Sequence, residues 1–252
     1  MPKKPKNSPQ RPPTAALGVL VVLIILISRF VQGGGVDLGT LFSSLSGSAT
    51  PTTSVSSSSK PGAFDFYVLA LSWSPDYCAT SGSSDPQQCS IGKKLGFVLH
   101  GLWPQYNVGY PSDCSKVQMP ADVKAKFATL YPSATLMDHE WTKHGTCTGL
   151  APEAYLTLSQ QIKNSVIIPT AYRAPQQPLR VTVGQLKREF VAANAGLGEG
   201  SLAPMCSGSG RYLQEVYVCF FSDGKPATCS SEIQRDAAKS CGLADFLVRN
   251  VK

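Results

Sequence analysis

The stretch FVLHGLWP at residues 97–104 combines a run of apolar residues with a histidine. Short runs rich in aromatic and branched side chains are typical of buried strands. We therefore expect His100 to lie at the end of a strand. The chain has three histidines in all, and the other two lie in HEWTKHGTC at residues 139–147. Imidazoles can divide the roles of base and acid near neutral pH, so the two segments together predict an acid/base site.

The second segment predicts a short helix that carries charged side chains. Asp138 is a suitable N-cap, so we expect this helix to begin at His139. Residues four apart share a helix face, which places His139 beside Lys143 and Glu140 beside His144. The histidine of the first segment would face them across a cleft.

Other parts of the chain predict the remaining elements of one fold. Further strands are expected at residues 65–71 and 211–221, and helices at residues 121–130, 152–164 and 183–193, the last with Thr182 as its cap. Strands and helices do not alternate as they do in a βαβ array. The predicted fold class is therefore α+β, with a central, mainly antiparallel sheet flanked by helices.

The N-terminal part of the chain differs in composition from the rest. Residues 1–33 join a basic start to an apolar run, the pattern of a secretory signal peptide, with an uncleaved anchor as the alternative. Residues 34–62 are mostly Gly, Ser and Thr and predict a flexible linker. Residues 63–252 are long enough for one domain with a sizeable core.

The charge of the chain is concentrated in its first part. Of its 23 basic and 16 acidic residues, six and one lie in residues 1–60, so a net charge of only +2 remains on residues 61–252. Bulk electrostatics therefore give little support for nucleic-acid binding, and any recognition of phosphate must be local.

Eight cysteines predict a disulfide framework. They are Cys78, Cys89, Cys114, Cys147, Cys206, Cys219, Cys229 and Cys241. An even number behind an export signal is typical of four disulfides formed in an oxidising compartment. Buried thiols in a cytosolic protein, or a zinc site, are the alternatives, although the chain has no Cys-x-x-Cys pair. Eight cysteines allow 105 pairings, which leaves the connectivity open.

Two common hydrolytic chemistries fit the histidine segments poorly. Zinc proteases place two histidines four residues apart, whereas His144 follows His139 by five positions, a rotation of about 140° around a helix. Lys143 would also repel a cation, so we expect no metal site. Cys147 is expected in a disulfide rather than as a nucleophile, and no Gly-x-Ser-x-Gly elbow occurs.

Metal-free phosphoryl transfer uses all of these residue types. RNA carries its own nucleophile, the 2′-hydroxyl, so the protein must supply a base, an acid and positive charge around the phosphorus. Two histidines and a lysine meet this need, the third histidine and Glu140 can hold the phosphate, and Trp103 offers a surface on which a base can stack.

Three motifs resemble those of a known family. Residues 100–104 (HGLWP) and 139–147 (HEWTKHGTC) are similar to the two catalytic segments of the ribonuclease T2 family, and residues 71–78 (LSWSPDYC) are similar to its N-terminal strand motif. The resemblance extends from about residue 64 to about residue 241 and therefore covers nearly the whole of the predicted domain.

The resemblance implies a role for each catalytic residue. His144 would be the general base that activates the 2′-hydroxyl, and His100 the general acid that protonates the leaving oxygen. His139 would bind phosphate. Glu140 and Lys143 would stabilise the pentacovalent state.

The resemblance also implies substrate contacts and a disulfide pattern. Trp103 would lie beside the base or ribose, and Ser72 and Leu136 match positions that line base pockets in some relatives. The implied disulfides are Cys78–Cys89, Cys114–Cys147, Cys206–Cys241 and Cys219–Cys229.

The implied activity is that of an exported endoribonuclease. It would cleave single-stranded RNA without metal or cofactor, through 2′,3′-cyclic phosphates to 3′-phosphate ends, and would leave DNA intact. Its activity should follow a bell-shaped pH profile on the acidic side of neutral. The alternative is a catalytically silent RNA- or protein-binding member of the same fold, but this chain keeps all three histidines with Glu140 and Lys143. We expect a monomer in the periplasm or outside the cell, held at a membrane only if the N-terminal segment stays uncleaved.

Overall fold

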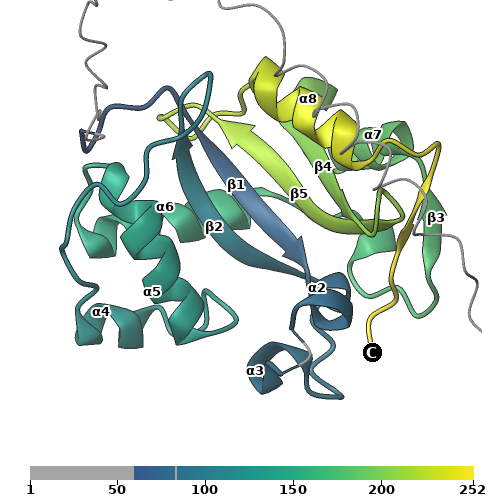
Figure 1. The fold of residues 1–252 in the computed structure, drawn as a ribbon, viewed down its shortest axis with the longest axis horizontal. Coiled ribbons are helices and arrows are strands. Elements are labelled where there is room, and N and C mark those ends of the chain that lie inside the picture. Colours follow the sequence, from purple (N-terminus) through teal and green to yellow (C-terminus); the bar gives the residue numbers. More distant parts are fainter. Residues whose placement is uncertain (1–59, 83) are drawn as a thin grey trace, which may run out of the picture. The chain divides into compact units, whose positions relative to one another are not determined.

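The apolar runs predicted as strands form three adjacent strands of a six-stranded sheet in the computed structural model, which describes residues 60–82 and 84–252 (Figure 1). The order across the sheet is β2-β1-β5-β6-β3, and β4 pairs with β5. All pairings are antiparallel except that of β5 with β6. The strands are β1 (Phe66–Trp73), β2 (Phe97–Gln105), β3 (Leu179–Val181), β4 (Leu202–Ser207), β5 (Tyr212–Phe220) and β6 (Phe246–Val248). The predicted α+β fold is confirmed.

Strand β1 lies inside the sheet, and its side chains alternate between two apolar layers. Leu69, Leu71 and Trp73 belong to the main core, whereas Phe66 and Val68 belong to a smaller cluster. Successive side chains of a strand point to opposite faces, so a strand that is covered on both faces is apolar at nearly every position.

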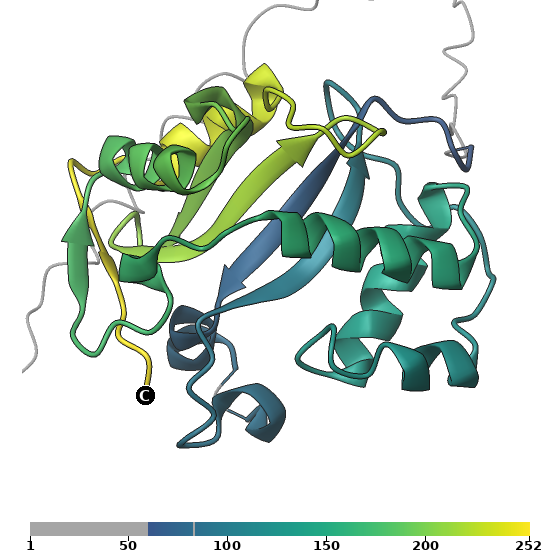
Figure 2. The ribbon, with the colours of Figure 1, turned by 180° about the vertical axis from the view of Figure 1, so that it is seen from behind.

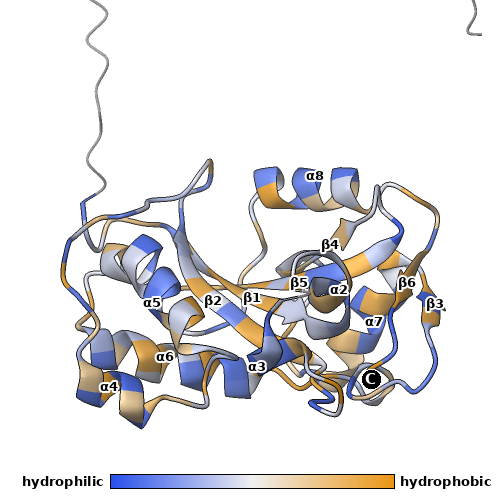
Figure 3. Cartoon of the chain, turned by 60° about the horizontal axis from the view of Figure 1, so that its bottom comes forward, coloured by the Kyte–Doolittle hydropathy of each residue, from blue (hydrophilic) through white to orange (hydrophobic). Residues whose placement is uncertain are grey.

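Helices cover both faces of the sheet. The helices of the described residues are α2 (Ser74–Thr80), α3 (Pro86–Cys89), α4 (Ala121–Lys126), α5 (Ala134–Lys143), α6 (Pro152–Ser165), α7 (Val183–Ala193) and α8 (Ser231–Ser240). Helices α6 and α7 lie on the face seen in Figure 2 and contribute Leu156 and Phe190 to the main core. Helix α8 lies over the opposite face, where Ala237 joins the smaller cluster. In Figure 3 hydrophobic colour is concentrated on the strands, while α8 is largely hydrophilic.

Two of the three remaining helix predictions are confirmed by α6 and α7. The Thr182 hydroxyl accepts a hydrogen bond from the Gln185 amide at 3.1 Å, as an N-cap does. The helix predicted over residues 121–130 is shorter, because α4 ends at Lys126 and Phe127 turns into the main core.

The predicted start of the histidine-bearing helix is wrong. Helix α5 begins at Ala134, and Ser133 is its cap, accepting from the Leu136 amide at 3.2 Å. Because Ser133 caps the helix five residues before Asp138, Asp138 lies inside the helix. Its Oδ2 atom forms an ion pair with Lys124 Nζ at 2.7 Å. Residues 134–138 therefore form the first part of the helix, and the histidine-bearing segment continues it.

The signal peptide or anchor predicted at residues 1–33, and almost all of the predicted linker, lie outside the described residues. Among residues 60–82 and 84–252, no helix has the length and apolar character needed to cross a membrane.

Candidate active site

One cavity of about 430 Å³ brings the two histidine segments together. Strand β2 contributes to its wall from one side and helix α5 from another. The predicted site residues that line it are His100, Trp103, His139, Glu140, Lys143 and His144. The predicted convergence of the strand and the helix on one cleft is therefore present.

His100 lies within β2, not at the end of a strand as expected. Ala70 of β1 pairs with Gly101 and Leu71 pairs with Leu99, so His100 is the extra residue of a β-bulge. A bulge redirects a side chain relative to its neighbours, and bulges recur beside active sites. The apolar pattern alone suggested an end because the polar histidine interrupts it.

The glycine after His100 allows close contact between the strand and α5. A Cβ atom at Gly101 would lie only 2.2 Å from Glu140 Oε2 and 2.2 Å from Trp103 Nε1. Those two atoms form a hydrogen bond of 2.5 Å, in which the indole donates to the carboxylate. A side chain at Gly101 would therefore separate the two partners.

Glu140 is almost completely buried, at 1 % exposed. Its Oε1 atom lies 3.6 Å from His100 Nε2. Burial raises the pKa of Glu140 to about 7, although the positive charge of His100 and the hydrogen bond from Trp103 act to lower it. Near neutral pH this carboxyl group can therefore hold a proton.

His144 is buried against the face of an indole. Its ring is stacked on that of Trp103, with centroids 5.1 Å apart and an angle of 30° between the planes. Burial lowers the pKa of His144 to about 3, and the positive charges of Lys143, His100 and His139 act in the same direction. His144 is consequently neutral over most of the acidic pH range.

The surroundings of His100, unlike those of His144, favour the protonated imidazole. Burial alone would lower its pKa, but the hydrogen bond to Glu215 and the charges of Glu215 and Glu140 outweigh burial and the charge of Lys143, so the pKa is raised. The Nδ1 atom of His100 lies 2.5 Å from Glu215 Oε1. Two imidazoles whose pKa values are moved apart are suited to act as base and acid together.

Positive charge lies at the mouth of the cavity. His139 is exposed and Lys143 is half-buried. The Lys143 Nζ atom lies 5.9 Å from the centre of the Tyr110 ring. In the described part of the chain, no group of three His, Cys, Asp or Glu side chains is arranged to hold a metal ion.

A second cavity, of about 200 Å³, lies on the other side of His100. Ser72 and Leu136 line it, and Trp103 does not. His100 lines both cavities, so it stands between two places that a dinucleotide could fill.

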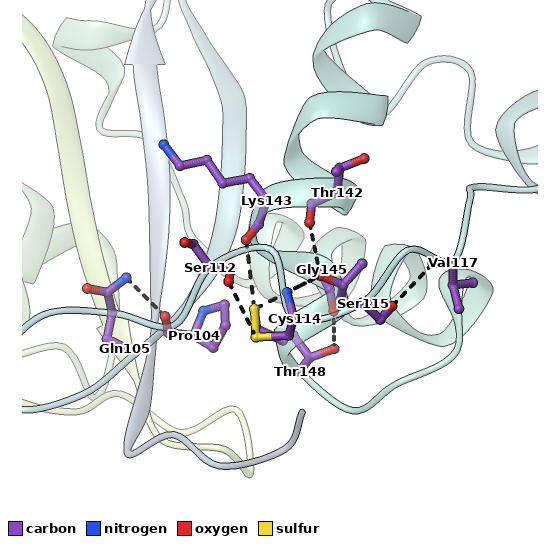
Figure 4. The surroundings of a disulfide bond; sticks show 12 residues. Pro104, Gln105, Ser112, Cys114, Ser115, Val117, Thr142, Lys143, Gly145 and Thr148 are labelled. Carbon is purple, nitrogen blue, oxygen red and sulfur yellow. Dashed lines mark hydrogen bonds between the residues drawn. A yellow bond between two sulfur atoms is a disulfide. The ribbon is translucent and has the colours of Figure 1, made fainter. Parts of the chain in front are cut away.

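The disulfide Cys114–Cys147 anchors the end of α5 (Figure 4). The Asp113 amide donates to the Lys143 carbonyl at 2.9 Å, and the Cys114 amide donates to the Thr146 hydroxyl at 3.2 Å. These contacts fix the turn that follows Lys143 and His144. The other disulfides are Cys78–Cys89, Cys206–Cys241 and Cys219–Cys229, so all four pairs are those that the resemblance implied.

Sequence reasoning missed several residues of the site. Glu215 and Tyr217 reach it from β5, and Tyr110 from the loop after β2. Glu232 on α8 accepts from the Gly109 amide at 2.6 Å and so holds the loop that carries Tyr110. An acidic residue within a predicted strand was the only sequence signal for Glu215.

Replacing Glu140 by glutamine should stabilise the protein at pH 8. The folded-state pKa of about 7 lies above the ordinary value of 4.5, so ionisation of Glu140 destabilises the fold progressively as the pH rises through that interval. The free energy of unfolding of Glu140→Gln should exceed that of the wild type by about 1–3 kcal/mol at pH 8 and be nearly equal to it at pH 4. Urea denaturation at both pH values tests this, and a difference independent of pH would contradict it.

Known proteins resemble the chain in sequence and in fold. The model of the ribonuclease T2 family matches residues 64–229. A ribonuclease of Aeromonas hydrophila is 41 % identical over 207 residues, which cover 80 % of this chain and 93 % of the relative. A variant of RNase MC1 in complex with 5′-UMP has a TM-score of 0.53 at 25 % identity, covering 64 % of this chain and 90 % of that one. An RNase-related protein from Calystegia sepium has a TM-score of 0.59 at 20 % identity, over 75 % of this chain and 97 % of its own.

Proposed function

This chain belongs to the ribonuclease T2 family and is an endoribonuclease, and from that premise we propose that His100 and His144 cleave single-stranded RNA as an acid and base pair. The observation that carries the proposal is that both imidazoles flank one indole. The ring centroids of His100 and His144 each lie 5.1 Å from that of Trp103. A phosphodiester group lying along this indole can therefore meet both histidines.

In the first step, neutral His144 takes the proton of the 2′-hydroxyl. The O2′–P bond forms and the P–O5′ bond breaks, while His100 gives its proton to the leaving O5′ through Nε2. The products are a 2′,3′-cyclic phosphate and a 5′-hydroxyl. The depressed pKa of His144 and the raised pKa of His100 provide the two starting charge states at mildly acidic pH.

Three further side chains act on the phosphate as charge develops on it. Lys143 and His139 supply positive charge from the mouth of the cavity. Glu140 donates a hydrogen bond to a nonbridging oxygen in its protonated form, which its pKa of about 7 keeps populated below neutrality. A fully ionised carboxylate at this place would instead repel the phosphorane.

The first step leaves the histidines in the charge states that the second step needs. His100 is then neutral and takes a proton from water, the new O–P bond forms, and the P–O2′ bond breaks. His144 returns its proton to O2′, which leaves a 3′-phosphate. Both steps balance without a cofactor.

The two nucleosides on either side of the scissile bond occupy different cavities. His100 protonates the leaving oxygen and also lines the smaller cavity, so the leaving nucleoside occupies the space beside Ser72 and Leu136. The nucleoside that carries the attacking hydroxyl lies in the larger cavity, against Trp103 and Tyr110.

The four disulfides favour an oxidising compartment. We place the mature enzyme in the periplasm or outside the cell, exported through residues 1–33 and acting as a monomer. Single-stranded RNA is the substrate, because its bases can reach the two cavities and its 2′-hydroxyl is the nucleophile.

Incubation of the full chain with a defined oligoribonucleotide in excess EDTA should give fragments with 2′,3′-cyclic phosphate ends, followed by 3′-phosphate ends. Mass analysis over time separates the two ends and reports the base on each side of the cut. The deoxyribonucleotide of the same sequence should stay intact. Intact RNA would reject the proposal in favour of a silent binding protein, and cleavage that EDTA stops would reject the metal-free mechanism.

A further inference from the structure

Glu215 is a buried carboxylate in contact with a catalytic histidine. It is 6 % exposed, while Leu213 and Val216 beside it on β5 are completely buried. Its Oε1 atom lies 2.5 Å from His100 Nδ1 and accepts from the Ser72 hydroxyl at 2.5 Å. A carboxylate in such surroundings is unfavourable unless it is paired and hydrogen-bonded, and these two partners meet that requirement.

The pairing of the strands places Glu215, Ser72 and His100 next to one another. Ser72 on β1 pairs directly with Glu215 on β5, so the two side chains lie on the same face of the sheet. His100 comes from β2 on the other side of β1, at the bulge. Three neighbouring strands therefore build one row, Glu215, Ser72 and His100.

The contact determines which nitrogen of His100 meets the substrate. An ionised carboxylate only accepts hydrogen bonds, so His100 Nδ1 must carry the hydrogen between them. The other nitrogen, Nε2, lies on the side of Glu140 Oε1, at 3.6 Å. Holding the proton on Nδ1 leaves Nε2 as the atom that exchanges a proton with the leaving oxygen.

The charges around His100 favour its protonated form. Burial raises the pKa of Glu215, but the hydrogen bond and charge of His100, with hydrogen bonds from Ser72 and Tyr217, lower it below its ordinary value. Glu215 is therefore ionised in the pH range in which His100 is protonated. Glu140 adds a second negative group when it is ionised, and Lys143 is the cation that opposes them.

We propose that Glu215 is a positioning residue for RNA cleavage, which fixes the tautomer and orientation of His100 and keeps it protonated as the general acid. This inference rests on the proposed function of His100. Ser72 holds Glu215 in place, because its hydroxyl donates a hydrogen bond to Glu215. The Ser72 side chain also lines the cavity of the leaving nucleoside.

The test compares Glu215→Gln with the wild type on two substrates. Glutamine keeps the size of the side chain but removes the charge, so kcat/KM for RNA should fall by about 10- to 100-fold. The loss should shrink to less than about 3-fold for uridine 3′-(4-nitrophenyl phosphate), whose leaving group departs without a proton. A merely structural role would lower both rates equally and would overturn the proposal.

A second readout follows the histidine directly. In ¹⁵N-resolved NMR titrations of the full chain, the pKa of His100 should be lower in Glu215→Gln than in the wild type, and neutral His100 in the wild type should carry its proton on Nδ1. If neutral His100 of the wild type carried its proton on Nε2, the proposal would be overturned even if the variant failed to fold. Glu153→Gln, which removes an exposed carboxylate on α6, is the matched control and should leave rate and titration unchanged.

Failure of this inference can be told apart from failure of the proposed function. If only the inference is wrong, the wild type cleaves RNA, His100→Ala does not, and Glu215→Gln either behaves like the wild type or loses activity equally on both substrates. If the proposed function is wrong, His100→Ala cleaves RNA as well as the wild type does.

Discussion

Replacing His144 by alanine should lower kcat for RNA cleavage by about 10²- to 10⁴-fold, the range expected for loss of a general base. His144 is buried beside Trp103 and is kept neutral because burial and then the charges of Lys143, His100 and His139 lower its pKa to about 3. The other imidazole beside that indole is His100, whose raised pKa favours its protonated form. Initial rates on a fluorogenic oligoribonucleotide, measured at pH 5.5, give the comparison.

His139→Ala is the matched control for this prediction. His139 lines the same cavity from the same helix but is exposed, so its loss should raise KM several-fold and leave most of kcat. Equal and small effects of the two substitutions would contradict the assignment of His144. In the wild type, kcat/KM should fall on the acid side only as the pH approaches the lowered pKa of His144, because protonation there removes the base.

The parts of the fold that rest on local pattern could be predicted from the sequence. The runs that became β1, β2 and β5 are apolar because their side chains pack into the core on the faces of the sheet. The N-cap of α7 is close in sequence to the residues that it caps. Charged side chains on α5 share one cavity because a helix repeats every few residues. The start of α5 was misplaced because two capping residues, Ser133 and Asp138, lie within one short stretch.

The parts that rest on distant pairing could not be predicted. The bulge at His100 depends on the register between β1 and β2, which no local pattern specifies. Glu215 lies 115 residues from His100 and reaches it only because β5 and β2 both flank β1. Helix α8, which holds the Tyr110 loop through Glu232, was missed because its sequence is mostly polar.

Replacing His100 by alanine should lower kcat for RNA by about 10²- to 10⁴-fold, but the loss should depend on the leaving group. The 5′-oxygen of a nucleoside needs a proton to depart, whereas 4-nitrophenolate does not. His100→Ala should therefore cleave uridine 3′-(4-nitrophenyl phosphate) within about 10-fold of the wild-type rate, and His144→Ala should remain impaired on both substrates. This contrast separates the acid from the base, which a loss of activity on RNA alone cannot do.

The pH dependence of the same variant completes the assignment. His100 must be protonated to act, so the wild-type rate on RNA is present below its pKa and is lost as the pH rises through it. That pKa is raised above 6.5, because Glu215 and Glu140 outweigh burial and Lys143. On the aryl substrate the wild type should lose the part of this alkaline limb that belongs to His100, and its pH profile should match that of His100→Ala, in which only the ionisation of Glu140 lowers the rate as the pH rises. If the alkaline limb on RNA were the same in His100→Ala as in the wild type, His100 would not be the general acid, and Glu140, with its pKa of about 7, would be the next candidate for that role among the residues that line the cavity.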